Sequence, residues 1–171
     1  WFINREGRVI KNVDDKWISY GQEDGLISTP VRVFCTSYGE LWVSGGHLSN
    51  AAVAYLSNGK WVKKIFPKLG WGIDARSVFE DYSGALWFGC NIDIKPEKGH
   101  QGGIIKFPDP RHKKDEFIHY KLPQTEVGVY GIGQSKDGII WVAGVSGCYF
   151  DSEQWHATHF PKEFIYHTDC I

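Results

Sequence analysis

A short phrase recurs three times along this chain and constrains its fold more than any other feature. In each copy a polar turn leads to a glycine, a tryptophan follows three residues later, and an apolar residue and a small residue come next. The glycine–tryptophan pairs are Gly39–Trp42, Gly84–Trp87 and Gly138–Trp141. The tryptophans stand 45 and 54 residues apart, and Trp1 lies 41 residues before the first of them. Such a period indicates tandem structural units.

A second marker lies between these phrases and keeps their phase. It is an aromatic residue, followed in the last three copies by a proline six residues later. The copies are KWISY (16–20), KWVKKIFP (60–67), EFIHYKLP (116–123) and QWHATHFP (154–161). Two markers in one phase divide the chain into related units at 1–20, 31–66, 75–120 and 127–160, and 164–171 would begin a further unit.

The sequence pattern within a unit indicates short strands. In the unit 75–120 we predict strands at 77–80, 85–89, 103–107 and 117–120, because these segments are rich in β-branched and aromatic residues and are bounded by turn formers. Almost no window of a dozen residues lacks Gly or Pro, so essentially no helix is expected.

Four-stranded antiparallel units of this length are typical of β-propeller blades. One such sheet cannot bury both faces alone, so neighbouring sheets stack around an axis. The recurrent tryptophan, on the second strand, is predicted to fill the space between blades. The fold class is therefore all-β, a propeller with about four blades. A partial larger propeller is favoured, and the alternative is a four-bladed ring closed by pairing of its two ends.

Composition narrows the function. The net charge is −1 with 23% charged residues and no nucleic-acid-binding footprint, and no apolar run is long enough to span a membrane. The four cysteines, Cys35, Cys90, Cys148 and Cys170, lack metal-site spacing and are expected to be buried free thiols, with a disulfide as the alternative. No catalytic, cofactor or metal motif is present, so none of these is expected.

Two segments carry a resemblance to a known family. EDGLISTPVRVF (23–34) and ARSVFEDYSGALWFGC (75–90), continued by GGIIKF (102–107), are similar to the two-component-regulator propeller repeat. The first segment supplies the opening DGL of the pattern. The second supplies Asp81, Gly84, Leu86, Trp87 and Gly89. The third unit departs from the pattern, with Ser135 in place of the aspartate.

The resemblance implies a function as well as a fold. Propellers of that family form the extracytoplasmic, periplasmic sensors of hybrid histidine kinases, and several respond to oligosaccharides. It implies a non-catalytic sensor that binds an oligosaccharide or another small polar ligand. A change in blade or dimer packing would then reach a kinase module, with a homodimer as one candidate assembly. The alternatives are a propeller lyase or glycosidase, and a scaffold for protein contacts.

The ligand is expected on the face that carries the loops between blades and the loops from second to third strands, because loops vary while sheets hold them in place. The long loop 90–102 holds His100 and is either a solvated excursion or a ligand loop. Trp71, between two glycines, could stack on a sugar ring or fold over the blade edge.

Three further candidates open the innermost strands. With one deletion before Gly39, Arg32 aligns with Arg76, and Tyr130 takes that place in the third unit. All three would then ring the channel mouth. Two guanidinium groups there could bind a carboxylate or sulfate, or could instead pair with a loop acid such as Asp24 or Asp74.

Overall fold

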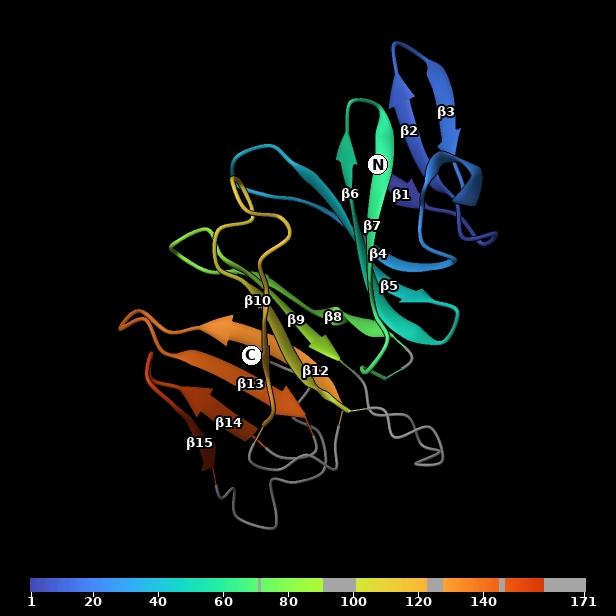
Figure 1. The fold of residues 1–171 in the computed structure, drawn as a ribbon. Coiled ribbons are helices and arrows are strands. Elements are labelled where there is room, and N and C mark those ends of the chain that lie inside the picture. Colours follow the sequence, from blue (N-terminus) through green and yellow to red (C-terminus); the bar gives the residue numbers. More distant parts are fainter. Residues whose placement is uncertain (71, 91–100, 123–127, 145–146, 159–171) are drawn as a thin grey trace.

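The computed structural model describes residues 1–70, 72–90, 101–122, 128–144 and 147–158. The described part of the chain is all-β: its strands form four antiparallel sheets stacked in sequence order, as Figure 1 shows. The one helical element described is a 3-10 turn at Gln22–Asp24. None of the described segments is a helix with the length and hydropathy of a membrane span. The predicted β-propeller class is confirmed.

Each sheet is an up-and-down meander in chain order. Sheet 1 contains β1 (Phe2–Ile3), β2 (Val9–Val13) and β3 (Lys16–Tyr20). Sheet 2 contains β4 (Thr29–Cys35), β5 (Leu41–His47), β6 (Asn50–Ser57) and β7 (Lys60–Phe66). Sheet 3 contains β8 (Ile73–Glu80), β9 (Leu86–Cys90), β10 (Gly103–Phe107) and β11 (Ile118–Tyr120). Sheet 4 contains β12 (Val129–Gln134), β13 (Ile140–Gly144), β14 (Gly147–Phe150) and β15 (Trp155–Thr158).

The sequence placed the strands of the third unit closely. The predicted strand 103–107 coincides with β10, 85–89 is displaced by one residue from β9, and 117–120 begins one residue before β11. The predicted strand 77–80 is the second half of β8, which begins at Ile73. This early start matters for the site, because β8 is irregular between Ile73 and Val78.

The glycine of the repeated phrase closes the turn between first and second strands. Gly39, Gly84 and Gly138 have φ angles of 86°, 84° and 93°, a region that costs glycine little. Each donates its N–H to the carbonyl three residues earlier, at 2.8–2.9 Å. In sheet 3 the turn is also held by Asp81, whose Oδ1 accepts the Ala85 N–H at 3.0 Å and whose Oδ2 accepts the Trp87 Nε1–H at 2.8 Å.

The tryptophan of the phrase packs between sheets, as predicted. Trp42 of sheet 2 is fully buried and lies 6.2 Å from Phe88 and 5.4 Å from Phe107 of sheet 3, between ring centroids. Trp87 of sheet 3 lies 6.3 Å from Trp155 of sheet 4. At the contact between sheets 3 and 4, the second-strand tryptophan of one sheet thus meets the fourth-strand aromatic of the next, which links the two sequence markers.

Trp141 differs from its two counterparts. It is half-buried and packs on Tyr149 of its own sheet, with ring centroids 5.1 Å apart. Sheet 4 is the last sheet of the described stack (Figure 1), so the described residues offer no later sheet to cover Trp141.

The small residue after the tryptophan allows two inner strands to approach. A Cβ added at Gly89 would lie 2.3 Å from Cγ1 of Val129 on β12. The Ser77 hydroxyl on β8 donates to the Val129 carbonyl across the same contact. A larger residue at position 89 would force sheets 3 and 4 apart.

A second link between sheets is repeated. The N–H of Ser37, in the turn of sheet 2, donates to Glu80 of sheet 3 at 2.7 Å. The N–H of Tyr82, at the equivalent place in sheet 3, donates to Gln134 of sheet 4 at 2.8 Å. Glu80 and Gln134 both end the innermost strand of their sheet. Sheets 2 and 3 are thus each tied by their turn to the sheet that follows.

Three cysteines are described, and all three are free. Cys90 and Cys148 are buried, and burial raises the pKa of each thiol to about 12. Cys35 is exposed, which the prediction of buried thiols did not anticipate, and Cys170 lies outside the described residues.

The choice between an open stack and a closed ring stays a prediction. In Figure 1 the sheets fan out from sheet 1 at one end to sheet 4 at the other. Among the described strands, β1 pairs with β2 and β15 with β14. The segment 164–171, which would begin a further blade, lies outside the described residues.

Candidate functional site

The predicted site residues fall into two groups. Arg32, Arg76 and Tyr130 lie on the innermost strands β4, β8 and β12. Trp71 and His100 lie outside the described residues, together with most of the loop 90–102. We call the side of the stack with the loops between sheets the mouth face, and the opposite side, with the first-to-second and third-to-fourth strand loops, the turn face.

Every innermost strand is irregular near its start, at the mouth face. The pairing register shifts between Pro30 and Arg32 in β4, and between Val129 and Gly131 in β12. In β8 it shifts between Ile73 and Val78. Bulges re-aim side chains and are common beside functional sites. Here they alter the direction of the side chains where β8 lies beside β4 and β12.

The register corrects the sequence alignment of the two arginines. Phe34 lies opposite Trp42 and Phe79 lies opposite Trp87, so Arg32 is level with Ser77 and not with Arg76. The predicted deletion is wrong because the turns before Trp42 and Trp87 have the same length, each closed by a glycine three residues before the tryptophan. Arg76 is instead equivalent to Val31 and to Tyr130.

Arg76 and Tyr130 meet across two sheets. The Arg76 guanidinium carbon lies 5.1 Å from the centre of the Tyr130 ring, a cation–π contact. Asp74 completes this group: its Oδ1 accepts the Arg76 backbone N–H at 2.8 Å and the Nε–H at 3.0 Å. We call Asp74, Arg76 and Tyr130 the rim cluster. Arg32 is exposed on β4, opposite Ser44.

Electrostatics keep the Asp74 carboxylate ionised. Partial burial acts most strongly on Asp74 and would raise its pKa, but the hydrogen bonds and the charge of Arg76 together lower that pKa below its ordinary value of 3.8. The alternative of a salt bridge with a loop acid is therefore confirmed for Arg76 and Asp74. Asp24, the other acid considered, accepts the Gly21 N–H at 2.9 Å.

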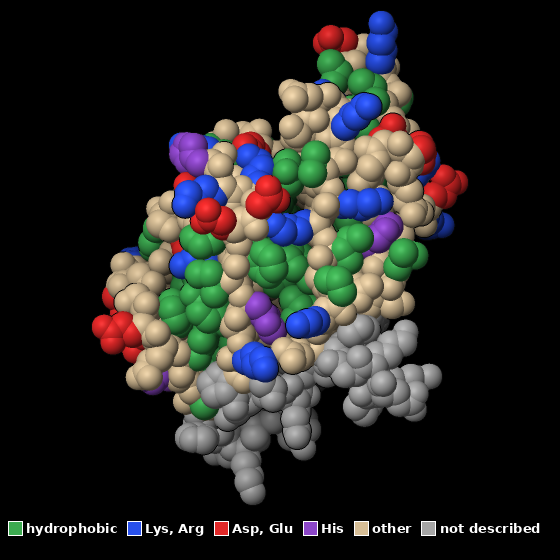
Figure 2. All heavy atoms as spheres, in the orientation of Figure 1, with side chains coloured by type: hydrophobic (Ala, Val, Ile, Leu, Met, Phe, Trp, Pro, Cys, Tyr) green, Lys and Arg blue, Asp and Glu red, His purple; other side chains and the backbone are tan. Residues whose placement is uncertain are grey.

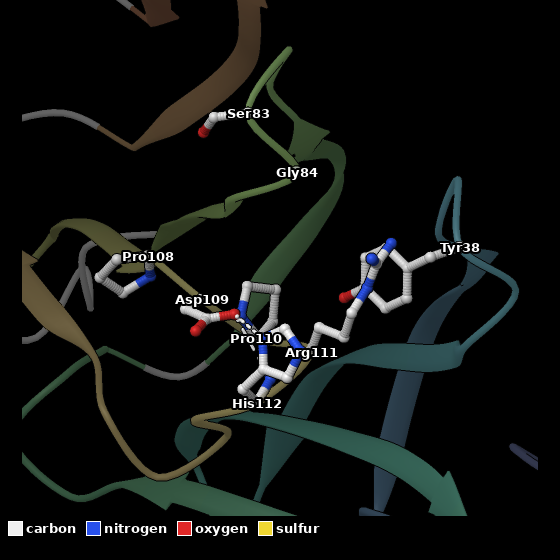
Figure 3. Close-up of a pocket in the computed structure, with 8 residues that line it drawn as sticks. All are labelled: Tyr38, Ser83, Gly84, Pro108, Asp109, Pro110, Arg111 and His112. Carbon is white, nitrogen blue, oxygen red and sulfur yellow. Dashed lines mark hydrogen bonds and ion pairs between the residues drawn. The ribbon is translucent and has the colours of Figure 1, made fainter.

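A second cluster lies at the turn face, in a part of the sequence that pattern reasoning passed over. The loop 108–117 joins β10 to β11 and reaches from sheet 3 to the turn of sheet 2. Between them is a cavity of about 180 Å³, shown in Figure 3. We call it the Arg111 cavity; it is lined by Tyr38, Ser83, Gly84, Pro108, Asp109, Pro110, Arg111 and His112.

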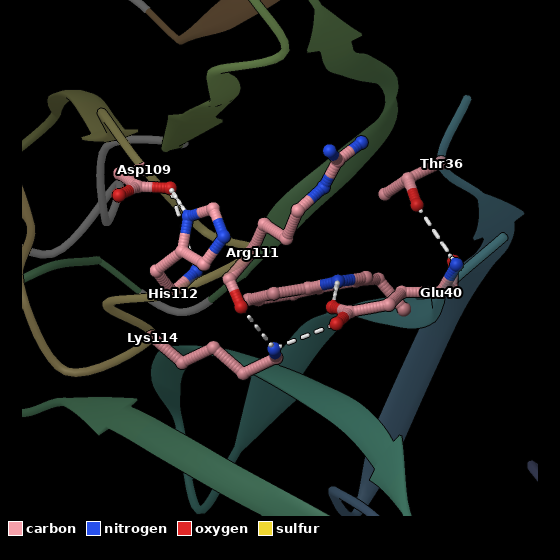
Figure 4. A network of polar contacts seen from close by, with 7 residues as sticks. Thr36, Glu40, Asp109, Arg111, His112 and Lys114 are labelled. Atoms are coloured by element: carbon pink, nitrogen blue, oxygen red, sulfur yellow. Dashed lines mark hydrogen bonds and ion pairs between the residues drawn. The ribbon is translucent and has the colours of Figure 1, made fainter. Parts of the chain in front are cut away.

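Arg111 lies over an aromatic ring of the neighbouring sheet. Its guanidinium carbon is 4.4 Å from the centre of the Tyr38 ring. The nearby carboxylate of Glu40 is already engaged, because it accepts the Lys114 Nζ–H at 2.7 Å and lies 3.4 Å from Trp42 Nε1 (Figure 4). Among the described residues, the Arg111 guanidinium has no hydrogen bond or ion pair with any acid.

The other polar groups of the Arg111 cavity are held in place. His112 Nδ1 lies 2.9 Å from Asp109 Oδ1, and this hydrogen bond is the main reason that the pKa of Asp109 is lowered. The Tyr38 hydroxyl is buried and has no hydrogen bond of standard geometry. Burial, and secondly the Glu40 carboxylate, raise the pKa of Tyr38 to about 12, so its hydroxyl stays protonated.

The loop 108–117 is anchored to sheet 2 by side chains as well. Lys64 of β7 donates from Nζ to the Asp115 carbonyl at 2.6 Å, and Lys114 bridges Glu40 and the Arg111 carbonyl. Pro108 and Pro110 fix their own φ angles. The run RHKK (111–114) between prolines and acids is the signal that could have singled out this loop.

The mouth face also carries an apolar hollow of about 300 Å³ at the outer edge of sheets 2 and 3. Apolar side chains gather at the surface in the middle of Figure 2, with Lys and Arg side chains around them. Phe66 and Phe117 meet in the hollow, with ring centroids 5.0 Å apart. Its lining is Ile65, Phe66, Pro67, Lys68, Leu69, Gln101, Phe117 and His119.

Comparison with known proteins gives a fold and no family. No family model and no curated protein matches the sequence. Among solved structures, the chain is similar to the extracellular domain described as that of a one-component system, BT4673, from B. thetaiotaomicron. The TM-score is 0.60 and the sequence identity is 11%, over 87% of this chain and 19% of that one. The chain thus spans about a fifth of that domain.

A second structure is a catalytically inactive variant of virginiamycin B lyase from Staphylococcus aureus, crystallised with quinupristin. It has 14% identity and a TM-score of 0.39, over 94% of this chain and 69% of that one, which is too low to support an argument. The geometry and the first comparison together assign this chain to the β-propeller fold.

Proposed function

We propose that this chain is a non-catalytic recognition propeller that binds an oligosaccharide or another small polar ligand at its mouth face. The observation that carries the proposal is the rim cluster. Arg76 of sheet 3 lies 5.1 Å from the Tyr130 ring of sheet 4, so one polar and aromatic surface spans two sheets. Such surfaces suit sugars, because a ring face packs on a flat group while hydroxyls bond to charged donors and acceptors.

We further propose that the chain belongs to an extracytoplasmic sensor of a larger signalling protein. Fold similarity to an extracellular domain supports this by analogy alone. The contact between sheets 3 and 4 offers a physical route for such a signal. Ser77 bonds to the Val129 carbonyl, and Gly89 lies against the Val129 side chain. A ligand that spans Arg76 and Tyr130 would favour one packing of this joint, and a kinase module of the parent protein would respond to it.

A binding titration tests the proposal. The chain is titrated with a panel of neutral and acidic oligosaccharides while tryptophan fluorescence and heat of binding are followed. A saturable change without new products is the expected result. Arg76→Ala and Tyr130→Ala should weaken binding at least about tenfold, the scale of a lost charged hydrogen bond.

Arg111→Gln is the matched control, because it alters the other arginine that lies over a tyrosine ring of a neighbouring sheet. It should leave the affinity for neutral oligosaccharides unchanged. If no oligosaccharide of the panel bound, or if the Arg76 and Arg111 variants lost affinity equally, recognition at the rim cluster would be refuted. Release of new reducing ends or unsaturated sugars would show a glycosidase or a lyase instead.

A protein-contact scaffold is the second candidate. The apolar hollow favours it, since Ile65 and Phe117 are 37% and 41% exposed at its edge. Exposed apolar surface of this kind is used in protein contacts. If Phe117→Ser abolished capture of a partner protein and no oligosaccharide of the panel bound, the function would be that of a protein-contact scaffold and not of a sensor.

A further inference from the structure

The Arg111 cavity is separate from the mouth face and has its own chemistry. It lies at the opposite ends of the strands from the rim cluster, because Arg76 is near the start of β8 while the loop 108–117 follows the end of β10. Its walls come from two sheets and from the turn of each, as Figure 3 shows. A ligand there would not touch any of the residues proposed above.

The cavity contains the positive charge of Arg111, and the nearby acids are already bonded to other residues. Glu40 is bound by Lys114 at 2.7 Å and Asp109 by His112 at 2.9 Å (Figure 4). Arg111 therefore lies over Tyr38 without a carboxylate of its own among the described residues. The aromatic platform orients the guanidinium and leaves the edge with the N–H donors available to a ligand.

A second observation points to a ligand independently of Arg111. The buried Tyr38 hydroxyl has no hydrogen bond of standard geometry. The Thr36 side chain is close enough to act on the pKa of Tyr38, but a buried hydroxyl without a well-formed hydrogen bond is uncommon and costs free energy. Figure 3 shows Tyr38 beside Arg111 from the neighbouring sheet, and both residues line the same cavity.

Size and charge select among anions. The cavity, about 180 Å³, is smaller than the roughly 300–1,000 Å³ of pockets that hold drug-sized ligands. Its lining carries the positive charge of Arg111 and the negative charge of Asp109, which is bonded to His112. A dianion would meet too little positive charge, whereas a single carboxylate matches the planar guanidinium with two parallel hydrogen bonds.

We propose that the Arg111 cavity binds the carboxylate group of a small molecule, with Arg111 as its main partner. The group could belong to a sugar acid or to a simple organic acid, and the shared chemistry is the carboxylate. The proposal does not depend on the function proposed for the mouth face.

Nuclear magnetic resonance of the whole chain tests this inference. The labelled protein is titrated separately with D-galacturonate, acetate, neutral D-galactose and sulfate at constant ionic strength. The two carboxylates should give saturable shifts of the backbone amides of Tyr38, Asp109, Arg111 and His112, and galactose and sulfate should not. Tighter binding of galacturonate than of acetate would identify a sugar acid, and equal binding would identify the carboxylate alone.

Variants locate the site. Arg111→Gln should weaken carboxylate binding at least about tenfold, the scale of a charged hydrogen bond. Arg111→Lys should recover only part of it, because the ammonium lacks the planar fork. Two controls should bind as the parent does: Lys113→Gln, which removes an exposed charge paired with Glu116, and Arg76→Gln in the rim cluster.

Three results would overturn the inference. Amide shifts of equal size with galactose would show that charge does not determine binding. Saturation by sulfate without carboxylate binding would remove the proposed class of ligand. Carboxylate binding unchanged in Arg111→Gln would place the site elsewhere. Arg111 is exposed, so the variants should fold, and unchanged amide signals of sheets 1 and 4 check this.

Discussion

Two arginines of sheet 3 lie over tyrosine rings of neighbouring sheets, and the electrostatic surroundings of the two pairs differ. Arg76 contacts Tyr130 of sheet 4 at the mouth face, and Arg111 contacts Tyr38 of sheet 2 at the turn face. Arg76 has an internal counter-ion in Asp74, at 3.0 Å. Arg111 has none among the described residues. One contact geometry thus gives a guanidinium bonded to a carboxylate in one place and a guanidinium without a bonded carboxylate in the other.

The difference has a local cause. Asp74 lies two residues before Arg76 in the irregular part of β8, so chain geometry alone brings the two together. Asp109 lies two residues before Arg111, but the turn of its loop directs it to His112. The proposed ligands follow from these partners: a neutral sugar at the rim cluster and a carboxylate in the Arg111 cavity.

The largest effect is expected from disrupting the contact between sheets 3 and 4, which underlies the Arg76–Tyr130 pair and not the Arg111–Tyr38 pair. A Cβ at position 89 would lie 2.3 Å from the Val129 side chain, so Gly89→Ala should lower the free energy of unfolding by about 2–3 kcal/mol and weaken oligosaccharide binding at the rim cluster. Urea unfolding followed by tryptophan fluorescence measures this. Gly131→Ala is the control: its new Cβ would meet Ala143 at an ordinary 3.8 Å. Equal destabilisation by both would show that the joint is not tightly packed.

A somewhat smaller effect is expected at the turn that helps to line the Arg111 cavity. Asp81→Ala removes the acceptor for the Ala85 N–H and leaves the buried Trp87 Nε1–H without its partner, which should cost about 2 kcal/mol. Thermal unfolding gives the comparison with Ser135→Ala, the equivalent change in sheet 4, which should cost about 0.5–1 kcal/mol. If Ser135→Ala cost as much, the aspartate would have no special role.

The rim cluster can be made to resemble the Arg111 cavity. Asp74→Asn removes the counter-ion of Arg76 and should raise acetate affinity at the mouth face up to about fivefold, since a partly exposed ion pair is worth up to about 1 kcal/mol. Amide shifts near Arg76 report the binding. Carboxylate binding in the Arg111 cavity should not change, and a change there would mean that the two sites are coupled.

The smallest effect is expected in the pH dependence of the free energy of unfolding. The pKa of Asp74 is lowered in the folded chain, so its pair with Arg76 stabilises the fold above about pH 3.8 and loses that contribution as pH falls further. The difference in unfolding free energy between the parent chain and Asp74→Asn should therefore be constant from pH 8 to 5 and shrink below pH 4. A difference that shrank near pH 6 would contradict the assignment to Asp74.

The sequence predicted the fold because its markers act locally. Gly84 and Trp87 recur in phase since each unit needs the same turn and the same aromatic contact with its neighbour. It also brought Arg76 and Tyr130 together, because both lie near the start of an innermost strand. The alignment of Arg32 with Arg76 was wrong because matching residue identity was preferred to matching turn length.

The Arg111 cavity was missed for a physical reason. Tyr38 and Arg111 are more than 70 residues apart in the sequence, and no period relates them. Their contact depends on a loop of sheet 3 reaching the turn of sheet 2, where Lys64 and Glu40 anchor it. Such a contact depends on the length and anchoring of one loop. A comparison of the repeats does not reveal these features.

The bonds from each turn to the following sheet give the stack a direction. The Ser37 amide binds Glu80 and the Tyr82 amide binds Gln134, always from an earlier unit to a later one. A unit copied elsewhere in a gene would keep this bond if it carried an acceptor side chain at the end of its first strand. Duplication, exchange and lengthening of such arrays would therefore require this polar position in each unit, in addition to the tryptophan contact between sheets.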